Sequence, residues 1–321
     1  MITIAGAGLA GLACAYALLR RGAAVTVFER AEVLGAESVA RFAGGMLAPW
    51  CERESAEEEV VRLGGRAFDW WAQITPVHRR GTLVSALRRD QSEIARFGRR
   101  TSAYRTVSGA EIATLEPALA GRFDHGLFFE QEAHLDPRRA LRDLAAEVQR
   151  LGGEIRLGSP APARVDLDCR GIHAALPDLR AVRGEMALLY CPEVEVRRTL
   201  RLLHPRTPIY LVPRGDGHYM LGATMVESDH AGPPTLRALM ELMGAAYALS
   251  PAFAEAEVVE TGAGLRPAYP DNLPRLEWRD GTLHLNGLYR HGFLLAPALA
   301  EAAAEQLMER RDENPREFRT A

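Results

Sequence analysis

The run GAGLAG at residues 6–11 constrains the fold more than any other part of the chain. It follows the apolar segment 2–5, which predicts a short buried strand, and it opens a segment to Arg21 that favours a helix ending before Gly22. Three glycines at this spacing allow a tight turn, a close approach of backbone to phosphate, and close packing of helix on strand. The run therefore predicts a dinucleotide-binding turn.

An acidic residue completes this first unit. A second strand at 24–28 leads into Glu29, whose carboxylate is placed to accept hydrogen bonds from an adenosine ribose. The same charge would repel the 2′-phosphate of NADP, so NADP is disfavoured. The amides that begin the helix would hold the pyrophosphate, because the helix dipole favours negative charge there. The turn alone does not distinguish FAD from NAD.

The rest of the chain shows two textures. Asp136 suits an N-cap and is followed by an amphipathic helical segment closed by a Gly-Gly pair at 152–153, with strands expected at 154–157 and 165–169. Elsewhere, alternating segments such as 209–212 and 219–222 flank a Gly-Asp-Gly turn, which is typical of β-hairpins.

These textures predict an α/β fold, with a Rossmann-type cofactor-binding domain and an inserted antiparallel-sheet substrate domain. We expect residues 1–80, 130–182 and 258–321 to form the discontinuous cofactor-binding domain. Residues 81–129 and 183–257 should form the substrate-binding domain. A ligand pocket is expected at the seam between them.

Composition excludes several other classes of protein. A formal net charge of −3, with no block of basic residues, argues against nucleic-acid binding. No apolar run reaches the roughly 18 residues of a membrane span. The four cysteines are far apart with no C-x-x-C spacing, so we expect neither a metal site nor a disulfide framework. Met1 leads directly into a strand pattern without a signal peptide, and the expected location is the cytosol.

Further motifs carry a family resemblance. The run RFAGGMLAP at 41–49 resembles the segment along the flavin in the FAD enzymes of the D-amino acid oxidase type. Other matching runs follow in the family's order, namely VRGEM at 182–186, YLVPR at 210–214, GATM at 222–225, GLRP at 264–267 and GLYRHGFLLAP at 287–297. The resemblance extends to about Ala300 and is greatest to glycine oxidases of the thiamine-biosynthesis type.

This resemblance implies a bound FAD, held non-covalently because no cysteine matches the linking position of the sarcosine oxidases. Small residues at 43–45 would let backbone amides approach the flavin ring, and the amides beginning the last helix would direct a positive dipole at the flavin C2 carbonyl. The residues expected at the FAD are Gly6, Gly8, Leu9, Ala10, Gly11, Glu29, Arg30, Arg41, Ala43, Gly44, Gly45, Met46, Leu47, Gly171, Arg266, Tyr289, Arg290, His291, Gly292, Phe293 and Leu294.

On the substrate side, the resemblance assigns Arg266 to the substrate carboxylate, with Tyr210 and Arg290 as further donors and Met225 lining the pocket. The planar guanidinium matches a carboxylate with two parallel hydrogen bonds. His291 is expected to be a structural residue beside the flavin, because hydride transfer from a neutral amine requires no side-chain base.

The implied reaction is the oxidation of glycine or a close small amino acid. Hydride passes from Cα to flavin N5, O2 is reduced to H2O2, and the imine would supply thiamine thiazole synthesis. The alternative is an oxidase of an N-substituted glycine, either sarcosine-like or a secondary-metabolite intermediate, since Arg266 would hold the same carboxylate. A flavin-binding protein without catalysis is a third alternative. Relatives of this type suggest a homo-oligomer.

Two departures from the family fall on the adenine side of the cofactor. The chain reaches Asp168 within about ten residues of Leu157, where relatives insert a longer strand meander, and it reads Cys-Arg-Gly at 169–171 in place of Ala-Thr-Gly. We therefore expect FAD to dissociate more readily than from longer relatives.

Overall fold

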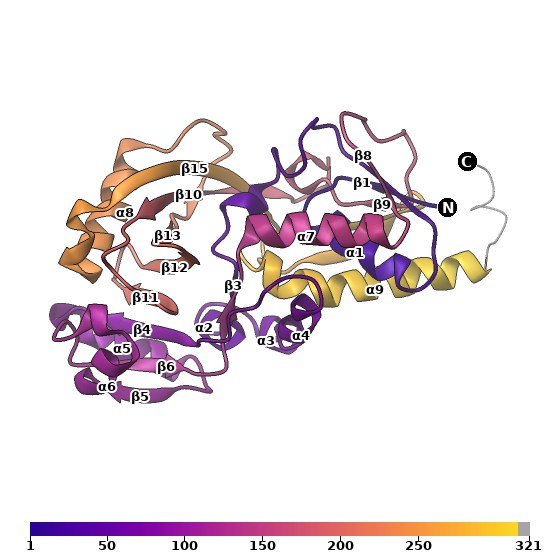
Figure 1. The fold of residues 1–321 in the computed structure, drawn as a ribbon. Coiled ribbons are helices and arrows are strands. Elements are labelled where there is room, and N and C mark those ends of the chain that lie inside the picture. The colour runs from indigo at the N-terminus through magenta and orange to yellow at the C-terminus, as the bar shows by residue number, and fades with distance from the viewer. Residues whose placement is uncertain (314–321) are drawn as a thin grey trace.

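Two lobes, each built around one β-sheet, form the computed structural model, which describes residues 1–313 (Figure 1). The predicted strand–helix–strand unit begins the first lobe. It consists of β1 (Ile2–Ala5), α1 (Leu9–Leu19) and β2 (Val25–Phe28), and β1 pairs with β2 in parallel. Gly22, with a φ of +78°, lies in the left-handed region just after the helix, as predicted for a glycine that ends one.

The first lobe contains a six-stranded sheet in the order β16-β17-β9-β1-β2-β8. Strands β8 (Glu154–Arg156), β9 (Leu167–Asp168) and β17 (Thr282–Asn286) pair in parallel with β2, β1 and β9, respectively. Strand β16 (Arg275–Arg279) pairs antiparallel with β17 and forms one edge of the sheet. Strands far apart in sequence thus meet beside β1. This is the doubly wound arrangement that the sequence predicts.

Helix α1 lies at the centre of this lobe. Ten of its eleven residues are buried, and it packs against the sheet, α7 (Pro137–Arg150) and α9 (Gly292–Glu313) (Figure 1). A helix buried all round has to be apolar all round, which explains its run of Leu and Ala. Helix α7 has the predicted cap, since the Asp136 carboxylate accepts hydrogen bonds from the amides of Arg138 and Arg139.

The second lobe contains a nine-stranded sheet. Eight strands follow the order β14-β10-β13-β12-β11-β4-β6-β5, and β15 pairs with β10. All neighbours are antiparallel except β4 and β11. The strands are β4 (Thr82–Ala86), β5 (Arg105–Ser108), β6 (His125–Phe129), β10 (Arg180–Tyr190), β11 (Thr199–Leu203), β12 (Ile209–Gly215), β13 (His218–Gly222), β14 (Val226–Glu227) and β15 (Glu257–Ala268).

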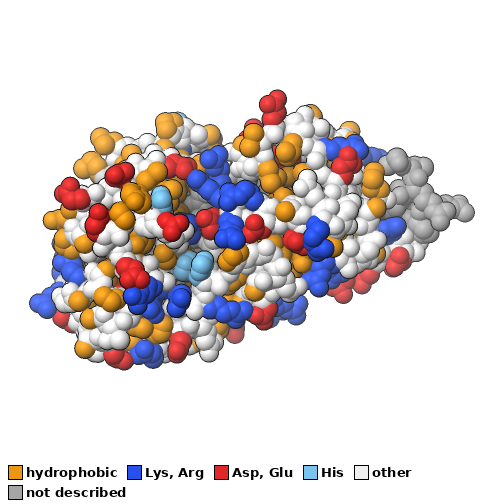
Figure 2. All heavy atoms as spheres, in the orientation of Figure 1, with side chains coloured by type: hydrophobic (Ala, Val, Ile, Leu, Met, Phe, Trp, Pro, Cys, Tyr) orange, Lys and Arg blue, Asp and Glu red, His pale blue; other side chains and the backbone are white. Residues whose placement is uncertain are grey.

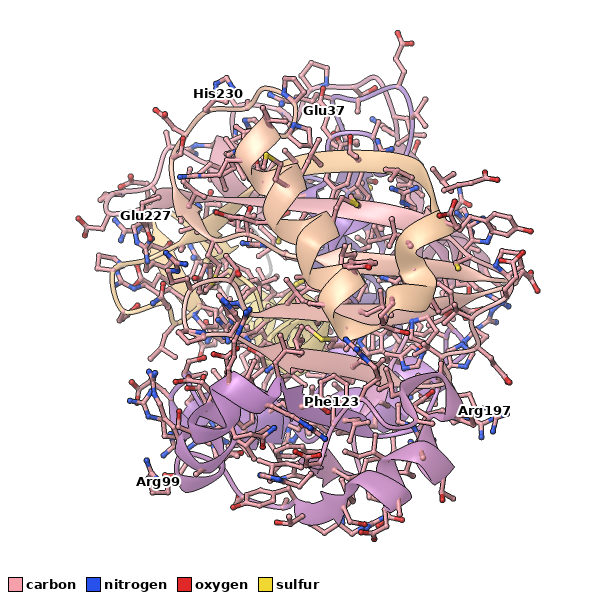
Figure 3. The ribbon with its side chains drawn as sticks, turned by 90° about the vertical axis from the view of Figure 1, so that its left-hand side faces the viewer. Glu37, Arg99, Phe123, Arg197, Glu227 and His230 are labelled. Carbon is pink, nitrogen blue, oxygen red and sulfur yellow. The ribbon has the colours of Figure 1, made fainter. Side chains whose placement is uncertain are left out.

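Three helices accompany this sheet. Helix α8 (Leu236–Leu249) lies across strands β10, β12 and β13, while α5 (Gln91–Arg99) and α6 (Gly109–Leu115) pack near β4 to β6. Figure 3 shows this lobe end-on, with Arg99 and Arg197 pointing away from the fold into solvent. The predicted hairpin at 209–222 is formed by β12 and β13.

The strand pairing leads us to propose a change to the expected domain division. Strand β15 pairs with β10 along its length, from Arg180 opposite Ala268 to Tyr190 opposite Glu257. Residues 258–268 and 180–182, expected in the cofactor-binding domain, therefore lie in the nine-stranded sheet. With those segments moved, we propose the same division into two domains; the residues beyond 313 lie outside the described part.

Short elements connect the two lobes. Strand β3 (Met46–Leu47) pairs antiparallel with β7 (Ala133–His134), and helices α2 (Pro49–Glu52), α3 (Glu58–Gly64) and α4 (Ala67–Ala72) follow β3. Within residues 1–313, no helix has the length and apolar character needed to cross a membrane.

The last helix contains a proline that the structure accommodates. Helix α9 begins at Gly292, so Pro297 lies inside it. A proline at 297 cannot donate to the carbonyl of Phe293, one turn earlier. That carbonyl instead accepts a hydrogen bond of 2.8 Å from the indole Nε1 of Trp71, which is fully buried. Trp71 is thus a core residue, and its indole satisfies the acceptor that Pro297 frees.

We expect Trp71→Phe to lower the free energy of unfolding by about 1–3 kcal/mol more than Trp70→Phe does. Both changes remove the same volume from one cluster, but only the first leaves the Phe293 carbonyl buried without a donor. Trp70 bonds instead to Glu301, which lies at the surface. Urea unfolding of the two variants measures the difference, and equal losses would contradict this account.

Candidate active site

A large cavity of about 710 Å³ lies at the seam between the two lobes. The N-termini of α1 and α9 border it on one side, and β10, β12 and β15 border it on the other. Figure 2 shows one molecular face over this seam, where basic, acidic and histidine side chains gather. The ligand pocket predicted between the domains is therefore present.

The glycine run forms one end of the cavity. Gly6 has a φ of +94°, and a Cβ at Gly11 would lie 1.9 Å from the Gly6 carbonyl oxygen. These two glycines thus make the turn and the close helix–strand contact that the spacing predicts. A Cβ at Gly8 would meet only the Ser38 hydroxyl, at 3.5 Å, so the backbone there faces open space.

Glu29 lies beside this turn and lines the cavity. Its carboxylate accepts hydrogen bonds from the amides of Ala7 at 2.9 Å and Ala31 at 3.0 Å, which fix its orientation. Pro160 and Ala161, from the shortened segment, also line the cavity, as does Gly171. The adenine side is therefore closed by a short loop rather than by a strand meander.

The predicted flavin-flanking segment follows the middle of the cavity. Gly45 has a φ of +68°, and a Cβ at Gly44 would lie 2.7 Å from the ring of Tyr210. The carbonyls of Ala43 and Gly44 accept hydrogen bonds of 3.1 and 3.0 Å from Arg214. Burial lowers the pKa of Arg214 to about 10, and it serves here as a positive anchor for backbone carbonyls.

The start of α9 closes the opposite side. Tyr289 has a φ of +49°, uncommon for a residue other than glycine, and its amide donates to the Pro267 carbonyl at 3.0 Å. A Cβ at Gly292 would lie 3.0 Å from Leu9. The N-termini of α1 and α9 therefore converge on one cavity, and each directs unpaired amides and a positive dipole into it.

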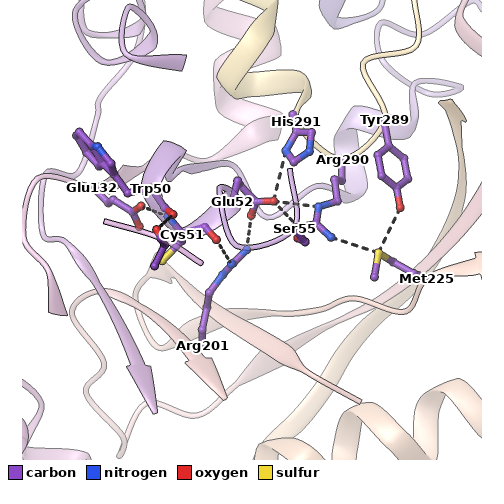
Figure 4. Close-up of polar contacts among 11 residues, drawn as sticks. Trp50, Cys51, Glu52, Ser55, Glu132, Arg201, Met225, Tyr289, Arg290 and His291 are labelled. Atoms are coloured by element: carbon purple, nitrogen blue, oxygen red, sulfur yellow. Dashed lines mark hydrogen bonds and ion pairs between the residues drawn. The ribbon is translucent and has the colours of Figure 1, made fainter. Parts of the chain in front are cut away.

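A buried carboxylate that sequence reasoning missed organises the substrate side (Figure 4). Glu52, at the end of α2, accepts hydrogen bonds from Arg290 at 2.7 and 2.9 Å through Oε2, and from Arg201 through Oε1. Burial alone would raise the pKa of Glu52, but Arg290 and Arg201 outweigh it and hold that pKa far below its usual value. Only its place six residues after Met46 of the flavin-flanking motif could have drawn attention to it.

His291 lies beside this cluster. Its Nδ1 is 3.3 Å from Glu52 Oε2, and the residue is buried. Burial lowers the pKa of His291 to about 4 despite the opposing effect of Glu52. The imidazole is therefore neutral near pH 7.

A second buried carboxylate binds the backbone of the residue that precedes Glu52. Glu132, completely buried, accepts a hydrogen bond of 2.7 Å from the amide of Cys51. Burial raises the pKa of Glu132 to about 7 and also raises that of the Cys51 thiol. A buried thiol with a raised pKa is not a nucleophile near pH 7.

Arg266 differs from the other arginines of the site. It lies on β15, lines the cavity, and donates a hydrogen bond of 3.1 Å to the Thr224 carbonyl. No ion pair to a carboxylate within residues 1–313 involves it, and burial lowers its pKa. A partly buried guanidinium of this kind is suited to an anionic ligand.

The position of Arg266 depends on a glycine and on a hydrogen-bond network. A Cβ at Gly184 would lie 2.0 Å from Arg266 Nη2, so the guanidinium lies directly over this backbone. The Thr224 hydroxyl donates to Glu185 at 2.8 Å, and Glu185 pairs with Arg183 at 3.1 Å. Arg183 in turn donates to carbonyls of the loop 230–233. Because the carboxylate of Glu185 binds Thr224 and Arg183, it does not form an ion pair with Arg266.

The four residues predicted on the substrate side come together in this cavity: Tyr210, Met225, Arg266 and Arg290. Most predicted cofactor residues line it as well, with three exceptions. Gly11 packs against Gly6, Leu47 lies in the core, and Arg41 donates to the Ala36 carbonyl and stacks over Phe42. Arg41, Leu47 and Gly11 therefore act through the loop and the turn, without facing the cavity.

The fold and the cavity define a dinucleotide-binding protein with a large cavity at the seam between its two lobes. The chain belongs to the FAD dependent oxidoreductase family DAO, whose pattern matches residues 1–306. It is 56% identical over 315 residues to the thiamine biosynthesis oxidoreductase ThiO of Rhizobium etli, covering 96% of each chain.

Solved structures share this fold. Glycine oxidase from Geobacillus kaustophilus superposes with a TM-score of 0.82 at 20% identity, covering 96% of this chain and 94% of that one. Iminodiacetate oxidase from Chelativorans sp. superposes with a TM-score of 0.79 at 23% identity, covering 96% and 95%. The predicted fold class, Rossmann-type with an inserted antiparallel-sheet domain, and the use of FAD are thereby confirmed.

We expect Gly184→Ala to weaken binding of a small carboxylate such as acetate by about tenfold or more, because one charge-assisted pair is worth roughly 1.5–3 kcal/mol. The added methyl would displace the Arg266 guanidinium, and Gly184 itself is not among the residues expected at the FAD. Titration of the flavin absorbance measures the affinity. Gly244→Ala is the matched control, because a Cβ there meets nothing within 4 Å. An unchanged affinity in Gly184→Ala would contradict the placement of Arg266.

Proposed function

We propose that this chain oxidises the amine of glycine, or of a close small amino acid, to the imine, with O2 reduced to H2O2. The observation that carries the proposal is Arg266, a cationic side chain without a carboxylate partner in the described structure, facing a cavity bordered by two helix N-termini. The likeness to the thiamine biosynthesis oxidoreductase ThiO supports a role for the imine in making the thiamine thiazole.

The cavity fits an FAD. Gly8 and the start of α1 offer amides and space for a pyrophosphate, and Glu29 offers a fixed carboxylate for the ribose. Gly44 and Gly45, with the start of α9, offer amides for the ring. FAD, when bound, supplies a two-electron acceptor for the substrate Cα–H. We propose that it is held non-covalently, since Cys169 is the one cysteine lining the described cavity and lies at the Gly6 end.

The side chains of the pocket bind and orient the substrate. Arg266 would pair with its carboxylate through two hydrogen bonds. Burial raises the pKa of Tyr210, so its hydroxyl stays protonated and can donate. Glu52 holds Arg290 in one orientation, and neutral His291 adds no charge near the amine. We infer that positioning, rather than proton abstraction by a side chain, is the contribution of this chain to the rate.

An N-substituted glycine remains a second candidate because of the charge in the pocket. Arg201, Arg266 and Arg290 bring three positive charges, whereas Glu52 brings one negative charge. A substrate with a second carboxylate on the amine substituent would balance this excess better than glycine does. The structural likeness to an iminodiacetate oxidase bears on the fold alone.

The test is anaerobic reduction of the flavin by a panel of amines. Glycine should bleach it, and peroxide should appear when oxygen is admitted. Ethylamine, which lacks the carboxylate, should be a poor reductant, because it would leave the Arg266 guanidinium desolvated and unpaired. Efficient oxidation of ethylamine would refute the carboxylate site. Faster bleaching by iminodiacetate or sarcosine than by glycine would favour the second candidate.

Arg266→Ala should retain the fold and the FAD but lose most turnover. Removing one partner of a desolvated ion pair costs roughly 3–5 kcal/mol, or about two to three and a half decades in kcat/KM. Arg266→Lys should recover only part of the loss, because an ammonium group cannot form the bidentate pair. Steady-state glycine kinetics on flavin-loaded protein give the values. Normal kcat/KM in Arg266→Ala would show that the carboxylate is held elsewhere.

A further inference from the structure

Met225 and Met46 both line the active-site cavity, but among the described contacts only the sulfur of Met225 accepts from two side-chain donors. Met225 follows β13 and is 53% exposed. The hydroxyl of Tyr289 and Nη1 of Arg290 donate to its sulfur at 3.4 and 3.5 Å (Figure 4). Arg290 is held in place by Glu52 and Ser55, so this donor is fixed. A thioether thus lies in the cavity with two proton-bearing groups directed at it.

We propose that Met225 is a self-modification site, oxidised to methionine sulfoxide by the peroxide that turnover releases. The proposal rests on the proposed function, which supplies H2O2 in this same cavity. A thioether is a soft nucleophile that peroxide oxidises without a metal or other cofactor. Met225 is therefore exposed to nascent peroxide before that peroxide is diluted into solvent.

The chemistry balances with these reactants alone. The sulfur lone pair attacks one peroxide oxygen and forms the S–O bond as the O–O bond breaks. The other oxygen departs as hydroxide and takes the remaining proton, which gives water and the sulfoxide. Sulfur loses two electrons, and the two peroxide oxygens gain them. Arg290 and Tyr289 can donate to the departing oxygen, which develops negative charge in this step.

Oxidation would change the pocket through the same two donors. A sulfoxide oxygen is a stronger acceptor than a thioether sulfur, so the contacts from Arg290 and Tyr289 become firm hydrogen bonds. Arg290 is then less available to the substrate. Loss of one charge-assisted hydrogen bond should raise KM for glycine by about tenfold, with a smaller effect on kcat.

The chain provides its own control methionines. Met240, on α8 outside the cavity, is 66% exposed and reports on peroxide in bulk solvent. Met220 is 1% exposed and shares the arginine-to-arginine peptide 215–237 with Met225, so fragment masses separate the two. Exposure alone therefore predicts more oxidation at Met240 than at Met225. The proposal predicts the reverse during turnover.

The experiment compares two treatments of the FAD-loaded protein. In one, the enzyme turns over glycine and O2 with catalase present to remove bulk peroxide; in the other, it receives H2O2 without glycine. Peptide mass spectrometry measures the gain of one oxygen, about 16 Da, at each methionine. We expect the ratio of sulfoxide at Met225 to that at Met240 to be at least about tenfold higher during turnover, because bulk peroxide reaches Met240 first.

The possible outcomes separate the two proposals. Peroxide production with the same ratio in both treatments, or with Met225 unmodified, overturns the self-modification alone. No peroxide from glycine overturns the proposed function itself. For Met225→Leu, KM for glycine is measured before and after repeated turnover, and it should not change. In the natural chain KM should rise with turnover and return to its first value after treatment with methionine sulfoxide reductases. An equal rise in both proteins would overturn the effect on the pocket.

Discussion

The substrate side of this enzyme depends on the buried carboxylate of Glu52. It binds Arg201 from β11 of one lobe and Arg290 from the loop before α9 of the other, so one side chain joins the two halves of the pocket. Removing either arginine would leave a buried charge less compensated, which is strongly unfavourable. The carboxylate therefore links the two lobes at the seam and fixes the direction in which Arg290 points.

Arginines in this site fall into three electrostatic classes. Arg201 and Arg290 share the carboxylate of Glu52, Arg214 donates to the backbone of the flavin-flanking loop, and Arg266 has no carboxylate partner within the described residues. The nearby carboxylate of Glu185 binds Arg183 and Thr224 and therefore does not pair with Arg266. These contacts leave the Arg266 guanidinium without a carboxylate partner in the described structure, and the proposed substrate site depends on that.

Small residues determine how closely the parts of the site approach one another. Gly184 leaves room for the Arg266 guanidinium, Gly44 for the Tyr210 ring, and Gly11 for the turn at Gly6. In each case a single Cβ would lie within 2.7 Å of its neighbour. These glycines therefore matter because they lack a Cβ and allow close packing, in addition to any turn that they form.

The sequence by itself determined the parts of the molecule that rest on local rules. The glycine run, the capped helix after Asp136 and the hairpin at 209–222 follow from short-range backbone preferences, and motif resemblance located Arg266, Tyr210, Arg290 and Met225.

Only the tertiary structure decided what depends on distant partners. It identified Glu52 and Arg201, 149 residues apart in sequence, as one ion pair, and it placed strand β15 in the substrate sheet. It also showed that Pro297 lies within a helix because Trp71 satisfies the freed carbonyl. Pairing across the seam leaves no periodic signal in either segment, so the physical reason is that these charges and carbonyls find their partners only after the chain has folded.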